Sequence, residues 1–211
     1  MNISDILLGA AIIIAAPAVN RVGEAKAQQI HPDQVVVDSP FVHDPVLAYE
    51  DGKYYLYSTG HGISQMTSAD RKHWTLCREG VLKNHEIPAW THDSVPGFHT
   101  HIWAPDVIHY RNKWYLAYSC STFGKNTSAI GLLSNTSLAN MNGWKDEGCI
   151  LASEGKRDNW NAIDPNFVID DKGNPWMTWG SFWDGIQLVK LDKKTMHVKK
   201  GAKPQIGRAH V

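Results

Sequence analysis

Apolar and aromatic residues occur along this chain in short runs that are separated by polar turn residues. Near the C-terminal end, an apolar segment at residues 167–169 is followed by the turn 171–174 and by a second apolar run at 176–179. Short runs rich in β-branched and aromatic residues, with Gly, Asn and Asp between them, are typical of β-hairpins. No run keeps the 3.6-residue period of an amphipathic helix, so the pattern predicts strands throughout.

The same strand–turn–strand pattern occurs twice upstream. Residues 45–49 lead through a turn at 50–53 to a second run at 54–58, and residues 105–110 lead through 111–113 to 114–119. Pro45, Pro105 and Pro165 stand at the start of the three units, at intervals of 60 residues. Each unit has room for about four short strands, which is the content of one propeller blade. We therefore expect an all-β fold with three blades of a β-propeller.

The N-terminal segment has the pattern of a targeting sequence. Residues 7–16 form an apolar run too short to span a bilayer, and Ala25-Lys26-Ala27 is a small-x-small cleavage site. We expect residues 1–27 to be a signal peptide, 28–38 a polar lead-in and 39–205 the three blades. The protein would then be secreted or periplasmic. The alternatives are an uncleaved anchor helix or an amphipathic start to the fold.

The last residues, 206–211, are expected to be a non-native tail. Their sequence, Ile-Gly-Arg-Ala-His-Val, is what a common sequencing-adapter oligonucleotide encodes in one frame. Propellers close with at least four blades, so three blades cannot form a ring. On this interpretation the gene continues beyond the chain.

The charge balance and the cysteines exclude some classes of protein. Lys plus Arg equals Asp plus Glu, 21 each, which argues against a nucleic-acid surface or an anionic-membrane patch. The three cysteines, Cys77, Cys120 and Cys149, permit one disulfide with one thiol left over. No Cys-x-x-Cys spacing occurs, so no zinc site is expected.

The residues immediately before the three repeat prolines are Asp44, Ala104 and Asp164. Equivalent positions of successive blades face a common central cavity, so two blades would offer carboxylates there. An Asp before Pro often only caps a turn. Two at equivalent positions, in a chain with nine Trp that look partly exposed, favour function instead. Paired carboxylates beside aromatic rings suit the hydrolysis of glycosidic bonds.

Several motifs, in order, resemble glycoside hydrolase family 43, and within it the endo-acting α-1,5-L-arabinanases, over about residues 39–199. These motifs are His43-Asp44-Pro45, Val95-Pro96-Gly97 through Ile102-Trp103-Ala104-Pro105-Asp106, Tyr118-Ser119-Cys120-Ser121-Thr122-Phe123-Gly124, Ser128-Ala129-Ile130-Gly131-Leu132, Asn161-Ala162-Ile163-Asp164-Pro165-Asn166 and Gly180-Ser181-Phe182-Trp183-Asp184-Gly185-Ile186.

The resemblance implies a five-bladed β-propeller and hydrolysis with inversion through three acids. Asp44 matches the general base that deprotonates the attacking water. Asp164 matches the carboxylate that raises the pKa of the general acid and orients it. The general acid itself is a Glu of the fourth blade, and no residue here matches it, because Glu154 lies outside the family motif. This chain alone is then expected to be inactive.

The resemblance also implies which residues contact the substrate. Trp103 and Phe123 match aromatics of the arabinose cleft, with core packing as the alternative for both. The remaining matches lie in the loops at Gly124, Asn161, Ala162, Ile163, Ser181 and Phe182. A calcium ion on the propeller axis is implied for the full-length protein, held by a His outside this chain. No metal ligand is expected here, since calcium prefers oxygen ligands to His43, His99 or His101. The chemistry needs no cofactor.

The resulting hypothesis is a secreted endo-arabinanase that cuts the arabinan side chains of pectin and is a monomer when full length. The alternatives are an exo-acting α-L-arabinofuranosidase or β-xylosidase of the same family, and a sugar-binding propeller without catalysis. The last blade of this chain would expose an unpaired strand edge that is prone to association.

Overall fold

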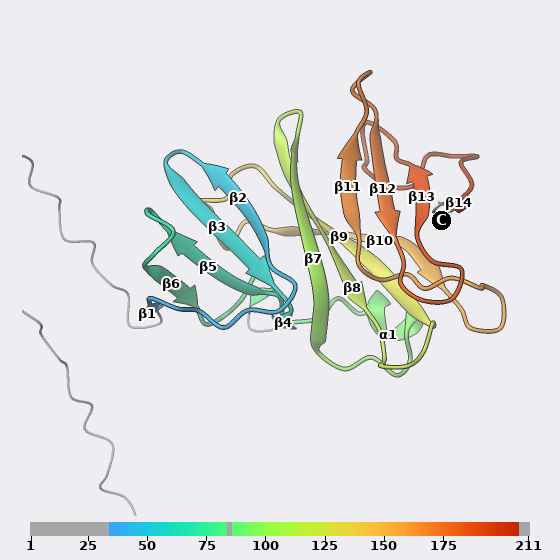
Figure 1. The fold of residues 1–211 in the computed structure, drawn as a ribbon, viewed down its shortest axis with the longest axis horizontal. Coiled ribbons are helices and arrows are strands. Elements are labelled where there is room, and N and C mark those ends of the chain that lie inside the picture. Colours follow the sequence, from blue (N-terminus) through green and yellow to red (C-terminus); the bar gives the residue numbers. More distant parts are fainter. Residues whose placement is uncertain (1–33, 84–85, 207–211) are drawn as a thin grey trace, which may run out of the picture. The chain divides into compact units, whose positions relative to one another are not determined.

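The computed structural model describes residues 34–83 and 86–206, which form three antiparallel sheets and one short helix (Figure 1). The expected signal peptide at 1–27 and residues 207–211 of the expected tail lie outside the described residues. The three sheets correspond to the three units of the sequence, and together they are consecutive blades of a β-propeller. The prediction of an all-β propeller is confirmed.

The first sheet has five strands in the order β1-β6-β5-β3-β2. They are β1 (Gln34–Val37), β2 (Val46–Glu50), β3 (Lys53–Ser58), β5 (Ser64–Ser68) and β6 (Trp74–Cys77). Residues 34–37 lie in the lead-in that the sequence pattern predicts, but β1 pairs antiparallel with β6 along its whole length. The first blade therefore includes part of that segment, because the backbone of β6 offers it an open edge.

The second sheet has the order β10-β9-β8-β7-β4. Its strands are β4 (Gly60–His61), β7 (His101–Tyr110), β8 (Lys113–Cys120), β9 (Ser128–Asn135) and β10 (Lys145–Ser153). The short β4 lies between β3 and β5 in sequence but pairs with β7, so it joins blade 1 to blade 2. A helix that the sequence pattern did not predict, α1 (Trp90–Ser94), lies in the connection between the two blades.

The third sheet has the order β11-β12-β13-β14. Its strands are β11 (Asn166–Ile169), β12 (Pro175–Trp179), β13 (Gln187–Lys190) and β14 (Gln205–Ile206). The first residue of the expected tail, Ile206, pairs with Gln187 of β13.

The three predicted hairpins are the inner halves of the blades: β2–β3, β7–β8 and β11–β12. In the first turn, Asp51 and Gly52 both have positive φ, which a two-residue hairpin turn matched to strand twist requires. The inner strand β7 contacts both β2 and β11, so the three inner strands lie side by side (Figure 1).

The middle blade is buried on both faces. Along β8, Leu116 and Tyr118 pack into the core shared with blade 1, while Tyr115 and Ala117 pack into the core shared with blade 3. Strand β9 is buried at every position and alternates in the same way. This two-residue period is what a strand between two apolar layers requires. The packing fixes how the inner strands, and the residues before them, face one another.

The disulfide that the cysteine count permitted does not form. Cys77, Cys120 and Cys149 are all free thiols. Burial raises the pKa of Cys149 to about 11, so this thiol stays protonated at neutral pH.

Candidate active site

Three residues in a left-handed backbone conformation precede the repeat prolines. Asp44 has φ of 49°, Ala104 of 37° and Asp164 of 55°. A following proline disfavours helical conformations, and positive φ is already costly for residues other than glycine. Ala104 lies where the pairing of β7 with β8 shifts register between Trp103 and Asp106. Such strained positions cluster at functional sites, where the surrounding structure holds them in place.

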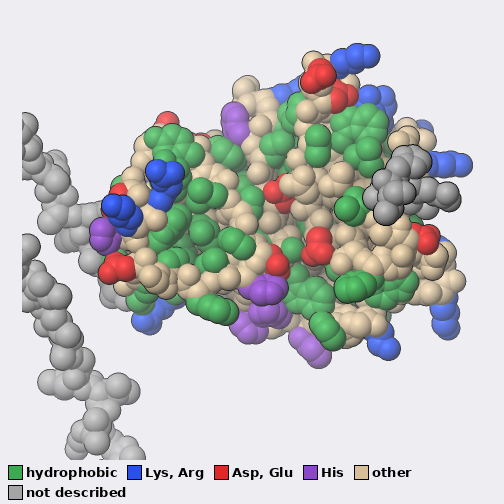
Figure 2. All heavy atoms as spheres, in the orientation of Figure 1, with side chains coloured by type: hydrophobic (Ala, Val, Ile, Leu, Met, Phe, Trp, Pro, Cys, Tyr) green, Lys and Arg blue, Asp and Glu red, His purple; other side chains and the backbone are tan. Residues whose placement is uncertain are grey.

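Asp44 and Asp164 line one hollow of about 720 Å³. Three more predicted site residues, Trp103, Phe123 and Phe182, line the same hollow. In the view of Figure 2, acidic side chains lie among hydrophobic ones beside a group of histidines. Five of the ten predicted catalytic and substrate-binding residues are thus brought together from three blades.

The Asp44 carboxylate is held by two neighbours. The Thr59 hydroxyl donates to Asp44 Oδ2 over 2.8 Å, and His43 Nδ1 lies 2.6 Å from the same oxygen. Thr59 directly follows β3, and its hydroxyl also accepts the backbone N–H of Ala104 over 2.8 Å. One hydroxyl therefore connects the candidate base of blade 1 to the equivalent position of blade 2.

The Asp164 carboxylate is in a different environment. Partial burial raises its pKa above the usual carboxyl value, and the negative charge of Asp44 raises it further. Among the described residues, no donor makes a hydrogen bond to this carboxylate; the backbone N–H of Asp164 donates to Ser119 Oγ over 3.0 Å. The negative charge of Asp44 therefore acts on Asp164, and both residues line the same hollow.

The exposed aromatic rings at the hollow are phenylalanines. Phe123 is 92% exposed and Phe182 85% exposed, and Phe41, which the sequence analysis missed, is 95% exposed. The sequence offered no signal for Phe41, because a phenylalanine is more often core than surface. The tryptophans are more deeply packed: Trp114 and Trp179 are buried, and Trp103 is partly buried, because large rings fill the space between sheets.

The predicted substrate loop at Asn161, Ala162 and Ile163 is buried in the structure, and its contact with substrate stays a prediction. Their exposed fractions are 3%, 0% and 9%. Asn161 Oδ1 accepts the Ser128 hydroxyl over 2.6 Å, and the Ala162 N–H donates to Ser153 Oγ over 2.9 Å. These bonds anchor the segment that leads to Asp164, so its residues position the acid.

Gly124 and Ser181, also predicted to contact substrate, neighbour Phe123 and Phe182 in sequence but do not line the hollow. The loop of Phe182 is strained, since Phe182 and Trp183 have φ of 55° and 41°. Gly180 opens this loop with φ of 112°, and a Cβ there would meet the carbonyl oxygen of Gly185. Phe182, in this loop, lines the hollow.

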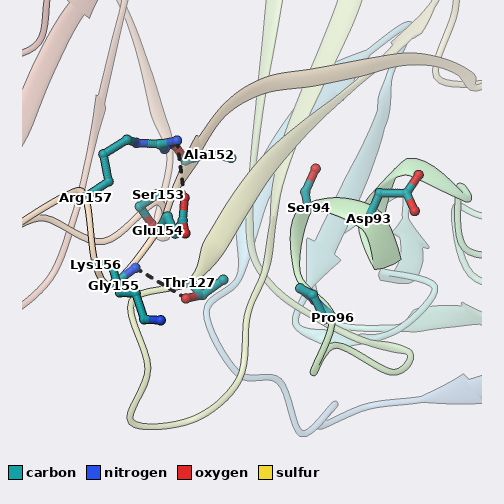
Figure 3. A pocket seen from close by; sticks show the side chains of 10 residues that line it. All are labelled: Asp93, Ser94, Pro96, Thr127, Ala152, Ser153, Glu154, Gly155, Lys156 and Arg157. Carbon is teal, nitrogen blue, oxygen red and sulfur yellow. Dashed lines mark hydrogen bonds and ion pairs between the residues drawn. The ribbon is translucent and has the colours of Figure 1, made fainter.

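A second hollow, of about 540 Å³, lies between α1 and the segment that follows β10 (Figure 3). Its lining includes Asp93, Thr127, Glu154 and Arg157. The Arg157 guanidinium lies 3.6 Å from Glu154 and 2.7 Å from Asp158. Glu154 thus has an ion-pair partner and lies apart from the two candidate acids.

The described residues contain no group of three or more His, Cys, Asp or Glu side chains that could hold a metal ion. The expectation that the calcium site of the full-length protein lies outside this chain stays a prediction. In the same part of the chain, no helix has the length and hydropathy needed to cross a bilayer.

A propeller that brings two carboxylates and exposed aromatic rings to one hollow has the parts of an enzyme that cleaves glycosidic bonds. The chain belongs to the glycosyl hydrolases family 43, whose sequence profile matches residues 34–209. Several of the relatives that it matches are named as arabinanases.

Two comparisons show how close the relatives are. Over 159 residues the chain is 43% identical to the extracellular endo-α-(1→5)-L-arabinanase 1 of Bacillus subtilis (strain 168), covering 74% of this chain and 48% of that protein. It superimposes with a TM-score of 0.73 and 53% identity on an exo-1,5-α-L-arabinanase from a bovine ruminal metagenomic library, covering 79% of this chain and 55% of that one.

A third comparison is with a complex. The Cellvibrio cellulosa α-L-arabinanase bound to arabinohexaose matches with a TM-score of 0.71 and 40% identity, over 77% of this chain and 52% of that chain. The chain thus spans about half the length of the relatives it matches.

Proposed function

We propose that this chain belongs to a longer secreted enzyme that hydrolyses internal α-1,5-L-arabinofuranosidic bonds of arabinan with inversion of configuration. The observation that carries the proposal is the pair Asp44 and Asp164 at one aromatic-lined hollow. Asp44 acts as the general base on the attacking water. Asp164 keeps a third acid, supplied by the rest of the protein, protonated and oriented.

The enclosing rings suit a sugar substrate. Phe41, Phe123 and Phe182 present flat apolar faces at the hollow, against which the C–H faces of arabinose rings can pack. The name of the Bacillus subtilis relative supports an extracellular enzyme that acts inside the polymer.

The experiment that tests the proposal uses the complete protein, meaning the longer chain that we propose contains these residues. Incubation with linear α-1,5-arabinan should release a ladder of oligosaccharides early in the reaction. The product first formed should have the opposite anomeric configuration by NMR. Intact polymer after long incubation would contradict the proposal. Retained configuration would contradict inversion alone.

The second candidate is an exo-acting enzyme of the same family. It is favoured by the 53% identity to an exo-1,5-α-L-arabinanase. An exo enzyme would release a single short product while the polymer shortens slowly. Product lengths at low conversion therefore separate the two candidates.

A non-catalytic sugar-binding propeller is the remaining alternative. In the complete protein, Asp44→Ala should abolish turnover and leave arabinan binding in place if the enzyme proposal holds. The 211 residues alone are proposed to be inactive, because no residue here takes the role of the general acid. Turnover of arabinan by the purified 211-residue chain would overturn that statement.

A further inference from the structure

The hydroxyl of Thr59 lies between two blades at the edge of the hollow. It donates to Asp44 Oδ2 over 2.8 Å and accepts the backbone N–H of Ala104 over 2.8 Å. Its own backbone N–H donates to the His43 carbonyl over 3.0 Å. Thr59 therefore contacts the residue before the candidate base, the base itself and the next blade.

The Thr59 hydroxyl accepts one hydrogen bond, from Ala104, and donates one, to Asp44. A backbone N–H can only donate, so it occupies a lone pair of the Thr59 oxygen. The hydroxyl proton is then available for Asp44, whose carboxylate can accept it. Among the described residues, both side-chain contacts of the Asp44 carboxylate fall on Oδ2. In the same part of the chain, no side-chain hydrogen bond involves the other oxygen, Oδ1, of this residue, which lines the hollow.

The same connection recurs one repeat later. Ser119 stands 60 residues after Thr59, and its Oγ accepts the backbone N–H of Asp164, which stands 60 residues after Ala104. Both hydroxyls thus hold a pre-proline residue of the following blade in its left-handed conformation. Thr59 differs in that its hydroxyl also holds a carboxylate.

We propose that Thr59 is a positioning residue for the general base. Its hydroxyl fixes Asp44 Oδ2, so that Oδ1 is presented to the attacking water, and ties this carboxylate to the inner strand of blade 2. The inference deepens the proposed function and rests on it. It assigns Thr59 no contact with the reacting atoms.

The test is a kinetic series in the complete protein with a linear arabino-oligosaccharide as substrate. Thr59→Val keeps the shape and removes the hydroxyl, Thr59→Ser keeps the hydroxyl, and Thr75→Val is the matched control on the outer strand β6 of the same blade. We expect Thr59→Val to lower kcat roughly 10–100-fold, since misplacement of about 1 Å can cost that much. KM should stay within about twofold. Thr59→Ser should recover most of kcat, and Thr75→Val should match the wild type.

The outcomes distinguish a failure of the proposed hydrolase function from a failure of the proposed role of Thr59. Asp44→Asn is measured in the same series, and full activity in that variant would contradict the proposed function. If Asp44→Asn is inactive while Thr59→Val keeps the wild-type kcat, or Thr59→Ser is as impaired as Thr59→Val, only the role of Thr59 is refuted. Thermal unfolding checks each fold. If Thr59→Val does not fold, Thr59→Ala is measured in its place, with the same expectations.

Discussion

The carboxyl groups of two aspartates at the two ends of the short strand β11 have pKa values that are shifted in opposite directions. Asp164, before the strand, has a pKa raised by partial burial and by Asp44. Asp170, after the strand, has a lowered pKa, because it accepts hydrogen bonds from Trp176 Nε1, from Asn174 and from the backbone of Lys172.

The two ends of blade 3 differ in the hydrogen-bond donors that surround each carboxylate. The carboxylate of Asp170 is surrounded by donors that close the β11–β12 turn, so its charge stabilises the fold. Asp164 meets another negative charge and, within the described residues, no donor to its carboxylate. A carboxylate held in that way costs stability, and proteins keep such groups where chemistry needs them. We therefore expect the hollow end of blade 3 to be its functional end.

The largest expected effect separates the two aspartates by activity. In the complete protein, Asp164→Asn should lower kcat on linear arabinan by about 10²-fold or more, because the third acid loses the charge that keeps it protonated. Asp170→Asn should leave kcat unchanged, since this residue only closes a turn. Initial rates of the two variants at saturating substrate make the comparison. Equal losses of kcat in both variants would contradict a special role of Asp164 in catalysis.

The next effect concerns the aromatic rings at the hollow end. Phe41→Ala should raise KM for arabinan roughly fivefold with little change in kcat, because one stacking contact is worth about 1 kcal/mol. Leu47→Ala is the control, since Leu47 is an exposed apolar residue of the same blade that does not line the hollow. An unchanged KM in the Phe41 variant would show that this ring does not contact the polymer.

At the turn end, the expected effect is on stability. Asp170→Ala removes the acceptor for Trp176 and for the Asn174 amide, so Tm should fall by a few degrees at neutral pH. Differential scanning calorimetry of the variant and of the wild type measures the change. A Tm equal to that of the wild type would mean that the turn closes without this carboxylate.

The smallest expected effect is a pH-dependent gain in the free energy of unfolding when Asp164 is replaced. Because the pKa of Asp164 is raised above 3.8 in the folded protein, the folded state binds its proton more tightly than the unfolded chain. This contribution to stability is present below the unfolded pKa and is lost as the pH rises through the folded pKa. The free energy of unfolding of Asp164→Asn, relative to that of the wild type, should therefore be higher at pH 7 than at pH 3. Denaturant titrations of both proteins at the two pH values measure this difference. Asp170→Asn should show the opposite sign, because its pKa is lowered.

Much of this arrangement was visible in the sequence because it depends on local patterns. The 60-residue spacing of the prolines, the hairpin turns and the two aspartates predicted the blades and the position of the acids. The pairing of β4 with β7 was not predictable, since two residues carry no pattern and their partner lies some 40 residues away. The burial of Asn161 was also not predictable, because its hydrogen-bond partner, Ser128, is distant in the sequence.

Phe41 escaped prediction for a different reason. A phenylalanine in a sequence is more often core than surface, and only the fold places this one at the edge of the hollow. The role of Thr59 likewise depends on the packing of blade 1 against blade 2, which brings residues 44, 59 and 104 together.

The most direct test of the account is the titration of the Asp164 carboxyl by ¹³C NMR, in the wild type and in Asp44→Asn. The pKa of Asp164 should lie above 3.8 in the wild type and should fall when the Asp44 charge is removed. A pKa of Asp164 at the ordinary value, identical in both proteins, would contradict the claim that the two acids meet at one hollow.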